Sequence, residues 1–220
     1  MAGSSDDSKR LYNSRIIDTF VKLINRRYSY VSIPELFRVA KMKPYEVADQ
    51  GHWFTQEQVN LFYDRLVKLT GNRNIAREAG RYSASPEAIG VMRQYILGMV
   101  GPAKAFSMIG KASINFTRSS ICESKKISSS KVEITVTPEK GVNEMPFQCE
   151  NRIGFFEALV AIFTNKLPEV DHTECIFKGG NVCRYTISWQ KPFSSYWQDA
   201  VNYIIIILLL LSSASVIIFP

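Results

Sequence analysis

The chain has 220 residues, of which 46% are hydrophobic and 12% aromatic, so most of it can bury a core and disorder is confined to short segments. Its formal charge of +7 comes from scattered basic residues rather than from a block of like charges. This pattern argues against a nucleic-acid partner and favours one soluble domain with attached segments. The polar residues 1–10 are interpreted as a disordered tail that is not a signal peptide.

The first half of the chain is predicted to be helical. Apolar residues recur at roughly helical spacing over residues 11–27, and Ser32 before Pro34 is a typical helix start. Thr55 and Gln58 match a capping box at the start of an amphipathic stretch, and Gly71 is a helix stop.

Two further helices are predicted before the pattern changes. Ser85 and Pro86 open one that runs to about residue 99. Gly101 and Pro102 break it, and another helix follows to Ile109.

The pattern changes after about residue 113. The stretch "KVEITVTP" alternates apolar and polar residues as a half-buried strand does, with a partner expected at 114–123. Residues 150–166 return to an apolar helix. The segments "VDHTECIFK" and "VCRYTISWQ" then indicate two strands joined by a short turn at 178–180. Helices followed by an antiparallel sheet with packed helices make an α+β fold.

The end of the chain is strongly apolar. Residues 203–220, "YIIIILLLLSSASVIIFP", carry no charge and are about as short as a helix that crosses a bilayer can be. Aromatic residues just before this stretch suit the lipid headgroup region. We therefore predict a C-terminal transmembrane helix with a juxtamembrane segment over 193–202, which places the N-terminal bulk on the cytoplasmic side of the cell inner membrane. The helix is either a tail anchor or, as we favour, the first part of a longer receptor.

One short region gathers rare residue types. The chain has two histidines and four cysteines, and three of the cysteines with one histidine follow in the order Cys149, His172, Cys175 and Cys183. Three thiolates and one imidazole are a complete tetrahedral set for zinc. Two alternatives stay open at this point, namely buried inert cysteines and a disulfide between Cys175 and Cys183. His172 can join the set only if a bulge re-aims it, because three residues along a regular strand it faces the other way.

The stretch "HTECIFKGGNVCRYTISW" resembles the end of the vinyl-reductase-type small-molecule-binding domain. That superfamily includes input domains of aromatic-sensing bacterial regulators, bacteriochlorophyll-synthesis accessory proteins and subunits of the Golgi tethering complex. In its aromatic-sensing members the zinc ligands are a cysteine, an acidic residue and two further cysteines. Cys149, Cys175 and Cys183 match this pattern, whereas His172 stands at the acidic position, with Glu174 nearby. The resemblance covers residues 83–190 and implies a structural zinc with no open position for catalysis.

The stretch at 49–82 is also similar to the helical lead of membrane-bound sensor histidine kinases that carry this domain. The domain organisation expected from these features is a tail (1–10), a helical segment (11–82), a ligand-binding sensor domain with the zinc site (83–192), and the juxtamembrane and transmembrane part (193–220).

The function expected from these features is a membrane-anchored sensor rather than an enzyme. It would bind a small apolar or aromatic molecule, pass the signal to an output module such as a histidine kinase, and act as a homodimer. The residues expected to line the ligand pocket, each of which can equally be ordinary core, are Phe106, Met108, Phe155, Phe156, Leu159 and Phe163. Two alternatives remain, namely a membrane-associated interaction scaffold like the tethering subunits, and a haem or gas sensor with His172 or a cysteine as axial ligand.

Overall fold

A computed structural model describes residues 9–89, 98, 101–190, 201, 203–205 and 207–208, and the structural statements below concern these residues. The chain divides into two units, which are residues 1–189 and residues 190–220. In the second unit, residues 201, 203–205 and 207–208 are helical. The rest of this description concerns the first unit.

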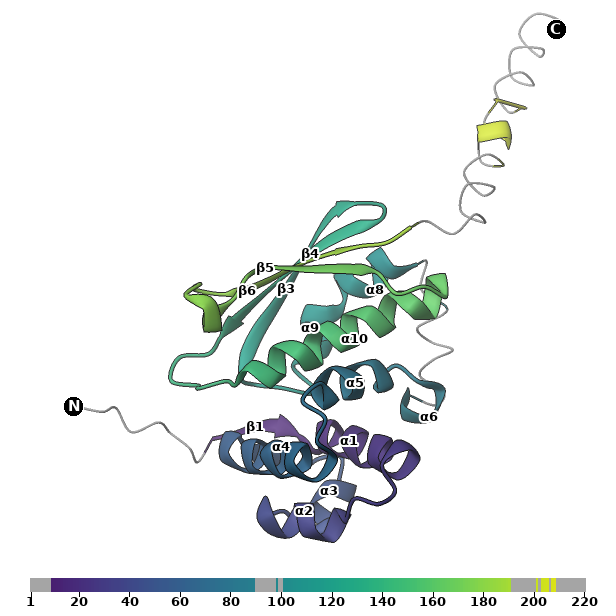
Figure 1. Ribbon diagram of the computed structural model, residues 1–220. Helices are drawn as coiled ribbons and strands as arrows, with labels where there is room; N and C mark the ends of the chain where they lie inside the picture. Colours follow the sequence, from purple (N-terminus) through teal and green to yellow (C-terminus); the bar gives the residue numbers. More distant parts are fainter. Residues whose placement is uncertain are drawn as a thin grey trace, which may run out of the picture. The chain divides into compact units, whose positions relative to one another are not determined.

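The N-terminal part of the first unit is a group of helices with a small two-stranded sheet (Figure 1). Strand β1 (Arg10–Asn13) pairs antiparallel with β2 (Trp53–Thr55). The helices are α1 (Ser14–Arg27), α2 (Ile33–Val39), α3 (Pro44–Ala48), α4 (Gln56–Thr70), α5 (Ile75–Tyr82) and the short α6 (Pro86–Ile89).

Local capping signals fix several helix ends. The Ser32 hydroxyl accepts from the Glu35 backbone N–H at the start of α2, and Thr55 and Gln58 form the expected capping box of α4. Gly71, with φ of 67°, ends α4 in the left-handed conformation that a glycine adopts without strain. The starts of α2 and α4 and the end of α4 therefore confirm the helix boundaries predicted from the sequence. The helix expected from residue 11 begins instead at Ser14, because residues 10–13 pair with β2.

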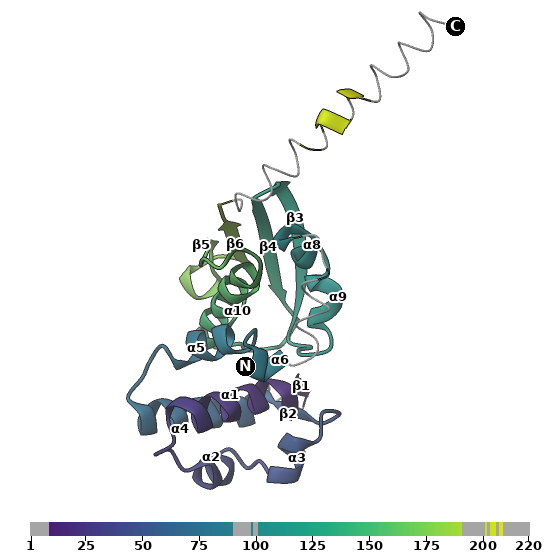
Figure 2. The same ribbon diagram turned by 90° about the vertical axis from the view of Figure 1, so that its right-hand side faces the viewer.

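The C-terminal part is an antiparallel sheet covered on one face by helices. Its strand order is β3-β4-β6-β5, with β3 (Ser120–Ser128), β4 (Lys131–Pro138), β5 (Glu169–Glu174) and β6 (Cys183–Ser188). Figure 2 shows α10 (Pro146–Thr164) over the β5 and β6 half of the sheet, and α8 (Pro102–Ser107) with α9 (Ile109–Ser113) towards β3. Side chains of β4 alternate between buried and partly exposed, as expected for a sheet covered on one face. The α+β character is therefore as predicted.

Two apolar cores result from this arrangement. The first core lies among α1, α2, α4 and α5 and includes Phe20, Phe62 and Leu66. The second core lies between the sheet and its covering helices and includes Phe106, Phe156, Tyr185 and Trp189.

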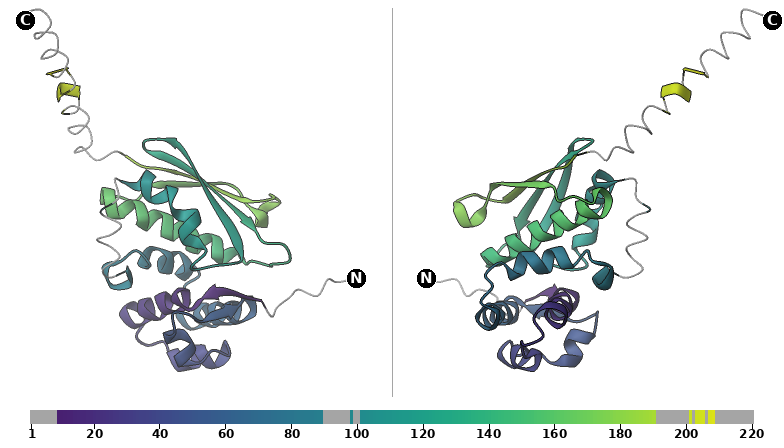
Figure 3. Two further views of the ribbon diagram at one scale, coloured as in Figure 1. Left: turned by 180° about the vertical axis from the view of Figure 1, so that it is seen from behind. Right: turned by 45° about the vertical axis from the view of Figure 1, so that its right-hand side comes forward.

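Helices α5 and α10 pack closely side by side between the two cores (Figure 3). A Cβ atom added at Gly154 would lie 2.1 Å from the Arg77 carbonyl oxygen, and one added at Gly80 would lie 2.1 Å from the Asn151 carbonyl oxygen. Only glycine permits so close an approach at these two positions. Glu157 of α10, whose side chain is 5% exposed, also accepts hydrogen bonds from Arg77 and Arg81 of α5.

The predicted C-terminal transmembrane helix is not supported. No helix among the described residues is long and apolar enough to cross a membrane. The described helical residues near the end reach only from 201 to 208, and residues 191–200, 202, 206 and 209–220 of the predicted segment lie outside the described part. The helix expected over 86–99 begins as predicted at Pro86, and residues 90–97 and 99 also lie outside the described part.

Candidate functional site

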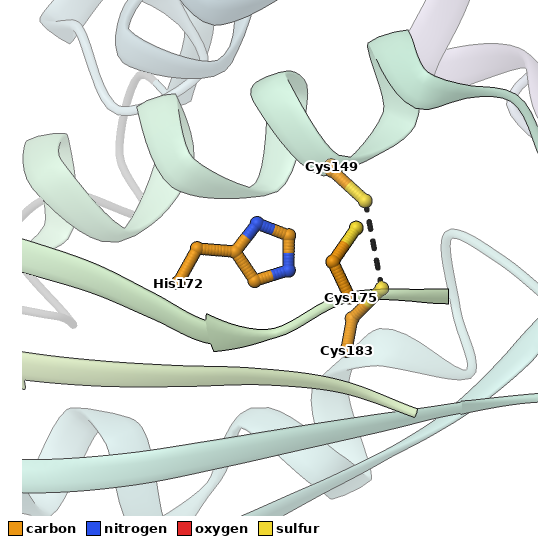
Figure 4. A group of neighbouring side chains, drawn as sticks. All are labelled: Cys149, His172, Cys175 and Cys183. Atoms are coloured by element: carbon orange, nitrogen blue, oxygen red, sulfur yellow. Dashed lines mark hydrogen bonds between the residues drawn. The ribbon is translucent and has the colours of Figure 1, made fainter. Parts of the chain in front are cut away.

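The two cysteines of the last hairpin, one histidine and one helical cysteine meet at one place in the second core (Figure 4). The ligand atoms of Cys149, His172, Cys175 and Cys183 all lie within 4.8 Å of one another. All four residues come from the set selected in the sequence. Cys149 lies in α10, His172 in β5, Cys175 just after β5, and Cys183 at the start of β6. We call these four residues the Cys/His cluster.

The local fold explains how His172 joins the three cysteines. The pairing of β5 with β6 shifts register between His172 and Glu174, which is the irregularity that the sequence argument required. The predicted three-residue turn at 178–180 is wrong. Cys175 is followed instead by a 3-10 turn (Ile176–Lys178) and by Gly179 with φ of 89°. The carbonyl oxygen of Cys175 accepts the backbone N–H groups of Lys178 and Gly180, both at 2.9 Å.

The sulfur atoms of the cluster are shielded from solvent. Cys183 is fully buried, and Cys149 and Cys175 are 3% and 7% exposed. The Sγ atoms of Cys149 and Cys183 lie 3.6 Å apart, within hydrogen-bonding distance for sulfur. A hydrogen bond from the Cys149 thiol lowers the pKa of Cys183, with help from the backbone N–H of Ile176 and from His172, although burial opposes the shift. The same interaction, together with burial, raises the pKa of Cys149.

His172 and Tyr185 add two unpartnered polar atoms beside the sulfurs. The two rings stack with centroids 4.2 Å apart. Within the described part of the chain, His172 Nε2 and the Tyr185 hydroxyl are buried and lack a hydrogen-bond partner. Both groups nevertheless interact with sulfur atoms of the cluster, because His172 contributes to the lowered pKa of Cys183 and Cys149 contributes to the raised pKa of Tyr185.

The geometry suits a single four-coordinate ion. Four ligands about 2.0–2.3 Å from a central metal lie roughly 3.3–3.8 Å apart in a tetrahedron, somewhat closer than the 4.8 Å upper limit observed. A small contraction of the side chains would close the site. Thiolate and imidazole ligands select soft metals, whereas oxygen ligands select hard ones. The Sγ atoms of Cys149 and Cys183, which lie 3.6 Å apart, could also form a disulfide if they moved closer together.

Comparisons with known proteins place the fold. No family model matches the sequence, and no curated protein matches it. Solved structures do match. An oxygen-binding H-NOX domain related to soluble guanylate cyclases aligns with a TM-score of 0.63 and 15% identity, over 82% of this chain and 96% of that chain. An H-NOX protein from S. oneidensis in the Fe(II)NO state aligns with a TM-score of 0.64 and 9% identity, over 81% and 99%. The fold is that of H-NOX domains.

The H-NOX likeness corrects two predictions. The resemblance to the vinyl-reductase-type domain is wrong, because the matching folds are H-NOX domains. The structural zinc predicted as cofactor is likewise contradicted, because the matching structures include a study of haem redox potential, aligned with a TM-score of 0.62 and 14% identity over 80% and 99% of the two chains. The short hairpin motif reflects ligand spacing, which unrelated folds can share. These comparisons do not test the four residues of the cluster.

In this H-NOX-like fold, the residues predicted to line an apolar pocket lie in or against the second core. Phe106, Phe156 and Leu159 are buried, Phe155 and Phe163 pack partly buried against the core, and Met108 caps α8 and is half-buried. The Phe106 ring lies 5.9 Å from that of Phe156 and 6.1 Å from that of Trp189. Such direct contacts are those of a filled core, and the pocket stays a prediction.

The fourth cysteine lies apart from the Cys/His cluster. Cys122 is on β3 and half-buried, and burial raises its pKa to about 11. It therefore offers a natural control for the other three cysteines.

Sequence reasoning missed a buried polar network near the first turn of α10. Gln148 donates to the Tyr12 hydroxyl at 2.6 Å, and that hydroxyl donates to Gln56. Arg152 pairs with Glu144, whose side chain is fully buried, and donates to Ser120 Oγ at 3.2 Å. A sequence signal for this network was Arg152, a charged residue that directly precedes the buried Ile153 of α10.

Proposed function

We propose that this chain is a sensory domain built on an H-NOX-like fold, and that its signal-receiving site is the Cys/His cluster. The observation that carries the proposal is the convergence of four ligand atoms within 4.8 Å of one another in the second core. The fold likeness to solved H-NOX domains supports a sensory rather than an enzymatic role. The predicted homodimer and inner-membrane location are tested by none of the described residues and stay predictions.

We propose that the cluster binds one soft metal ion. Cys149, His172, Cys175 and Cys183 together offer a bound ion four ligand atoms of the thiolate and imidazole types. It would join α10 to β5 and β6. Because cysteines bind a metal as thiolates, loss of the ion would leave free thiols at this place and change the junction.

The position of the cluster lets such a change reach the N-terminal part. Cys149 precedes Arg152 and Gly154 on α10, and the close contact of Gly154 with Arg77 ties α10 to α5. Gln148, next to Cys149, is hydrogen-bonded to Tyr12 of β1. A shift of the first turn of α10 would therefore disturb contacts on both sides of the helix.

Elemental analysis of the purified chain tests the metal site. The chain is prepared under reducing conditions, and its metal content per protein is compared between the wild type, Cys183→Ser and Cys122→Ser. We expect about one ion per wild-type chain, a strong loss in Cys183→Ser, and no loss in Cys122→Ser, because Cys122 lies outside the cluster.

A wild-type chain that carries no metal after addition of soft divalent ions would contradict this proposal. Equal metal content in Cys183→Ser would also contradict it. Circular dichroism on all three proteins separates loss of the site from loss of the fold.

A haem-dependent gas sensor is the second candidate, because solved neighbours include haem proteins and an oxygen complex. The described residues do not fit a haem well. The chain has two histidines. His52 packs its ring against Phe54, with centroids 4.8 Å apart, in the turn before β2. His172 lies among three sulfurs and is stacked on Tyr185, whose ring also contacts Phe156 at 5.4 Å. A porphyrin needs a flat apolar slot beside its axial ligand, and these rings fill the space at His172.

An absorption spectrum separates the two candidates. The chain is produced with added haem and compared with His172→Ala. A Soret band that appears in the wild type and disappears in His172→Ala would favour the haem sensor over the metal cluster. We expect no such band, and retention of metal in the same samples.

A further inference from the structure

A cleft remote from the Cys/His cluster lies where β1, the segment before β3 and the turn after β4 meet. Its volume is about 440 Å³, which is in the range of small-molecule sites. The residues that line it are Lys9, Arg10, Leu11, Arg118, Glu139, Lys140 and Val142.

Backbone hydrogen bonds hold the three walls of this cleft together. The Arg118 N–H donates to the Leu11 carbonyl at 2.8 Å, and the Glu139 N–H donates to the Ser119 carbonyl at 2.8 Å. The turn after β4 is closed by the Val142 N–H to the Glu139 carbonyl and by Gly141, whose φ is 79°. The cleft therefore has a fixed frame rather than loose loop walls.

The charges around the cleft are mostly positive. Four of the lining residues are basic and one is acidic. Among the residues that the structure describes, no carboxylate lies within ion-pair distance of Arg10, Arg118 or Lys140. Uncompensated cations that gather around one cleft raise the local potential for an anion.

Arg118 is held in place by an aromatic side chain. Its guanidinium carbon lies 3.8 Å from the centre of the Trp53 ring, so one face of the guanidinium is stacked while its N–H edge stays available. An arginine fixed in this way loses little entropy when it binds the oxygens of a phosphate.

The remaining wall residues specify more than charge. Leu11 is 7% exposed and Val142 packs against the first core, so both present apolar surface. Glu139 supplies a carboxylate that accepts hydrogen bonds from hydroxyl or amino groups. A bare phosphate would use only part of this cleft.

We propose that this cleft binds a phosphorylated small molecule. Arg10, Arg118 and Lys140 would contact phosphate oxygens, and Glu139 would accept a hydrogen bond from a hydroxyl or amino group of the same molecule. The cleft shares no residue with the Cys/His cluster, so we propose it as a second input rather than a part of the first.

Isothermal titration calorimetry on the full chain tests the cleft, with pyrophosphate, a nucleoside diphosphate and a short single-stranded oligonucleotide as probes. The variants are Arg118→Gln and Lys140→Gln, and the control is Arg38→Gln, an exposed arginine of α2 outside the cleft. We expect saturable binding of the nucleoside diphosphate, weaker binding of pyrophosphate, and about a tenfold loss of affinity in each cleft variant. The control should match the wild type.

Three outcomes would overturn this proposal. They are no heat with either small probe at millimolar concentration, an equal loss in Arg38→Gln, and binding of the oligonucleotide alone. Metal content measured on the same samples should not change, which separates failure of the cleft from failure of the Cys/His cluster.

Discussion

The two cores of the first unit differ in what they bury. The first core is made of aliphatic and aromatic side chains, with the tyrosines Tyr12 and Tyr82 among them and no cysteine. The second contains three cysteines and the Tyr185 hydroxyl among its apolar residues. Of the five buried side-chain atoms without a partner in the described part of the chain, two lie at the second core, on His172 and Tyr185. Two more belong to the ion pair of Arg152 with Glu144, and the fifth is Arg65 Nε on α4.

The two cores therefore differ in whether burial alone accounts for their stability. A core of apolar side chains gains free energy by burial alone, with no need of a further group. Unpartnered polar atoms cost free energy, so they persist where a ligand, ion or water satisfies them. The first core therefore supports the fold, whereas the second also contains the candidate site.

Two phenylalanines of equal burial give the strongest test of this contrast. Phe62 is 1% exposed in the first core, and Phe106 is fully buried in the second. We expect Phe62→Ala and Phe106→Ala each to lower the free energy of unfolding by about 3–5 kcal/mol, measured by urea denaturation. Only Phe106→Ala should speed native-state labelling of the buried thiols by a thiol reagent, because only it opens a cavity in the core that holds them. Equal labelling in both variants would mean that the cores are not distinct.

The contact between α5 and α10 tests whether the two cores unfold together. Gly154→Ala places a Cβ atom 2.1 Å from the Arg77 carbonyl, so one helix must move. We expect a loss of about 3 kcal/mol in the free energy of unfolding, by denaturation followed with circular dichroism. The control is Gly141→Ala, where φ is 79° but no atom lies within 4 Å, and where about 1 kcal/mol of backbone strain is expected. Two separate unfolding steps in Gly154→Ala would show that the contact joins otherwise independent cores.

The parts of the fold that sequence reasoning predicted correctly have local signals. The N-cap Ser32, the capping box at Thr55 and the stop at Gly71 act within a few residues, so pattern alone identifies them. Strands β1 and β2 were missed because they are four and three residues long and pair across some forty positions, which leaves no periodicity to detect.

The sequence predicted the four residues of the Cys/His cluster but not the residues around them. The spacing of Cys149, Cys175 and Cys183 selected the cysteines, since rare ligand types close together are informative. The register shift that brings in His172 depends on strand pairing, and the bond between Gln148 and Tyr12 joins residues 136 positions apart. The family resemblance failed for a related reason, because a short hairpin motif carries little information on the rest of the fold.

Tyr12 belongs to the first core, is hydrogen-bonded to Gln148 of α10, and gives the smallest and most specific test. It is 3% exposed, and burial is the main cause that raises its pKa from 10.0 to about 12. The Tyr12 hydroxyl ionises near pH 10 in the unfolded chain and only near pH 12 in the folded chain. Its contribution to the stability of the fold is therefore complete below pH 10 and is lost as the pH rises from 10 through 12. By pH 11 the loss should be about 1.4 kcal/mol.

The variant Tyr12→Phe isolates this contribution. At pH 8 it should be less stable than the wild type by about 1 kcal/mol, because Gln148 and Gln56 lose their hydrogen bonds to the hydroxyl. Since phenylalanine does not ionise, the gap should close by about pH 11, whereas other buried tyrosines such as Tyr185 affect both proteins equally. Urea denaturation at pH 8, 10 and 11 measures the gap. A gap that stays constant with pH would mean that Tyr12 is accessible to water and that the polar network does not seal the boundary between the two cores.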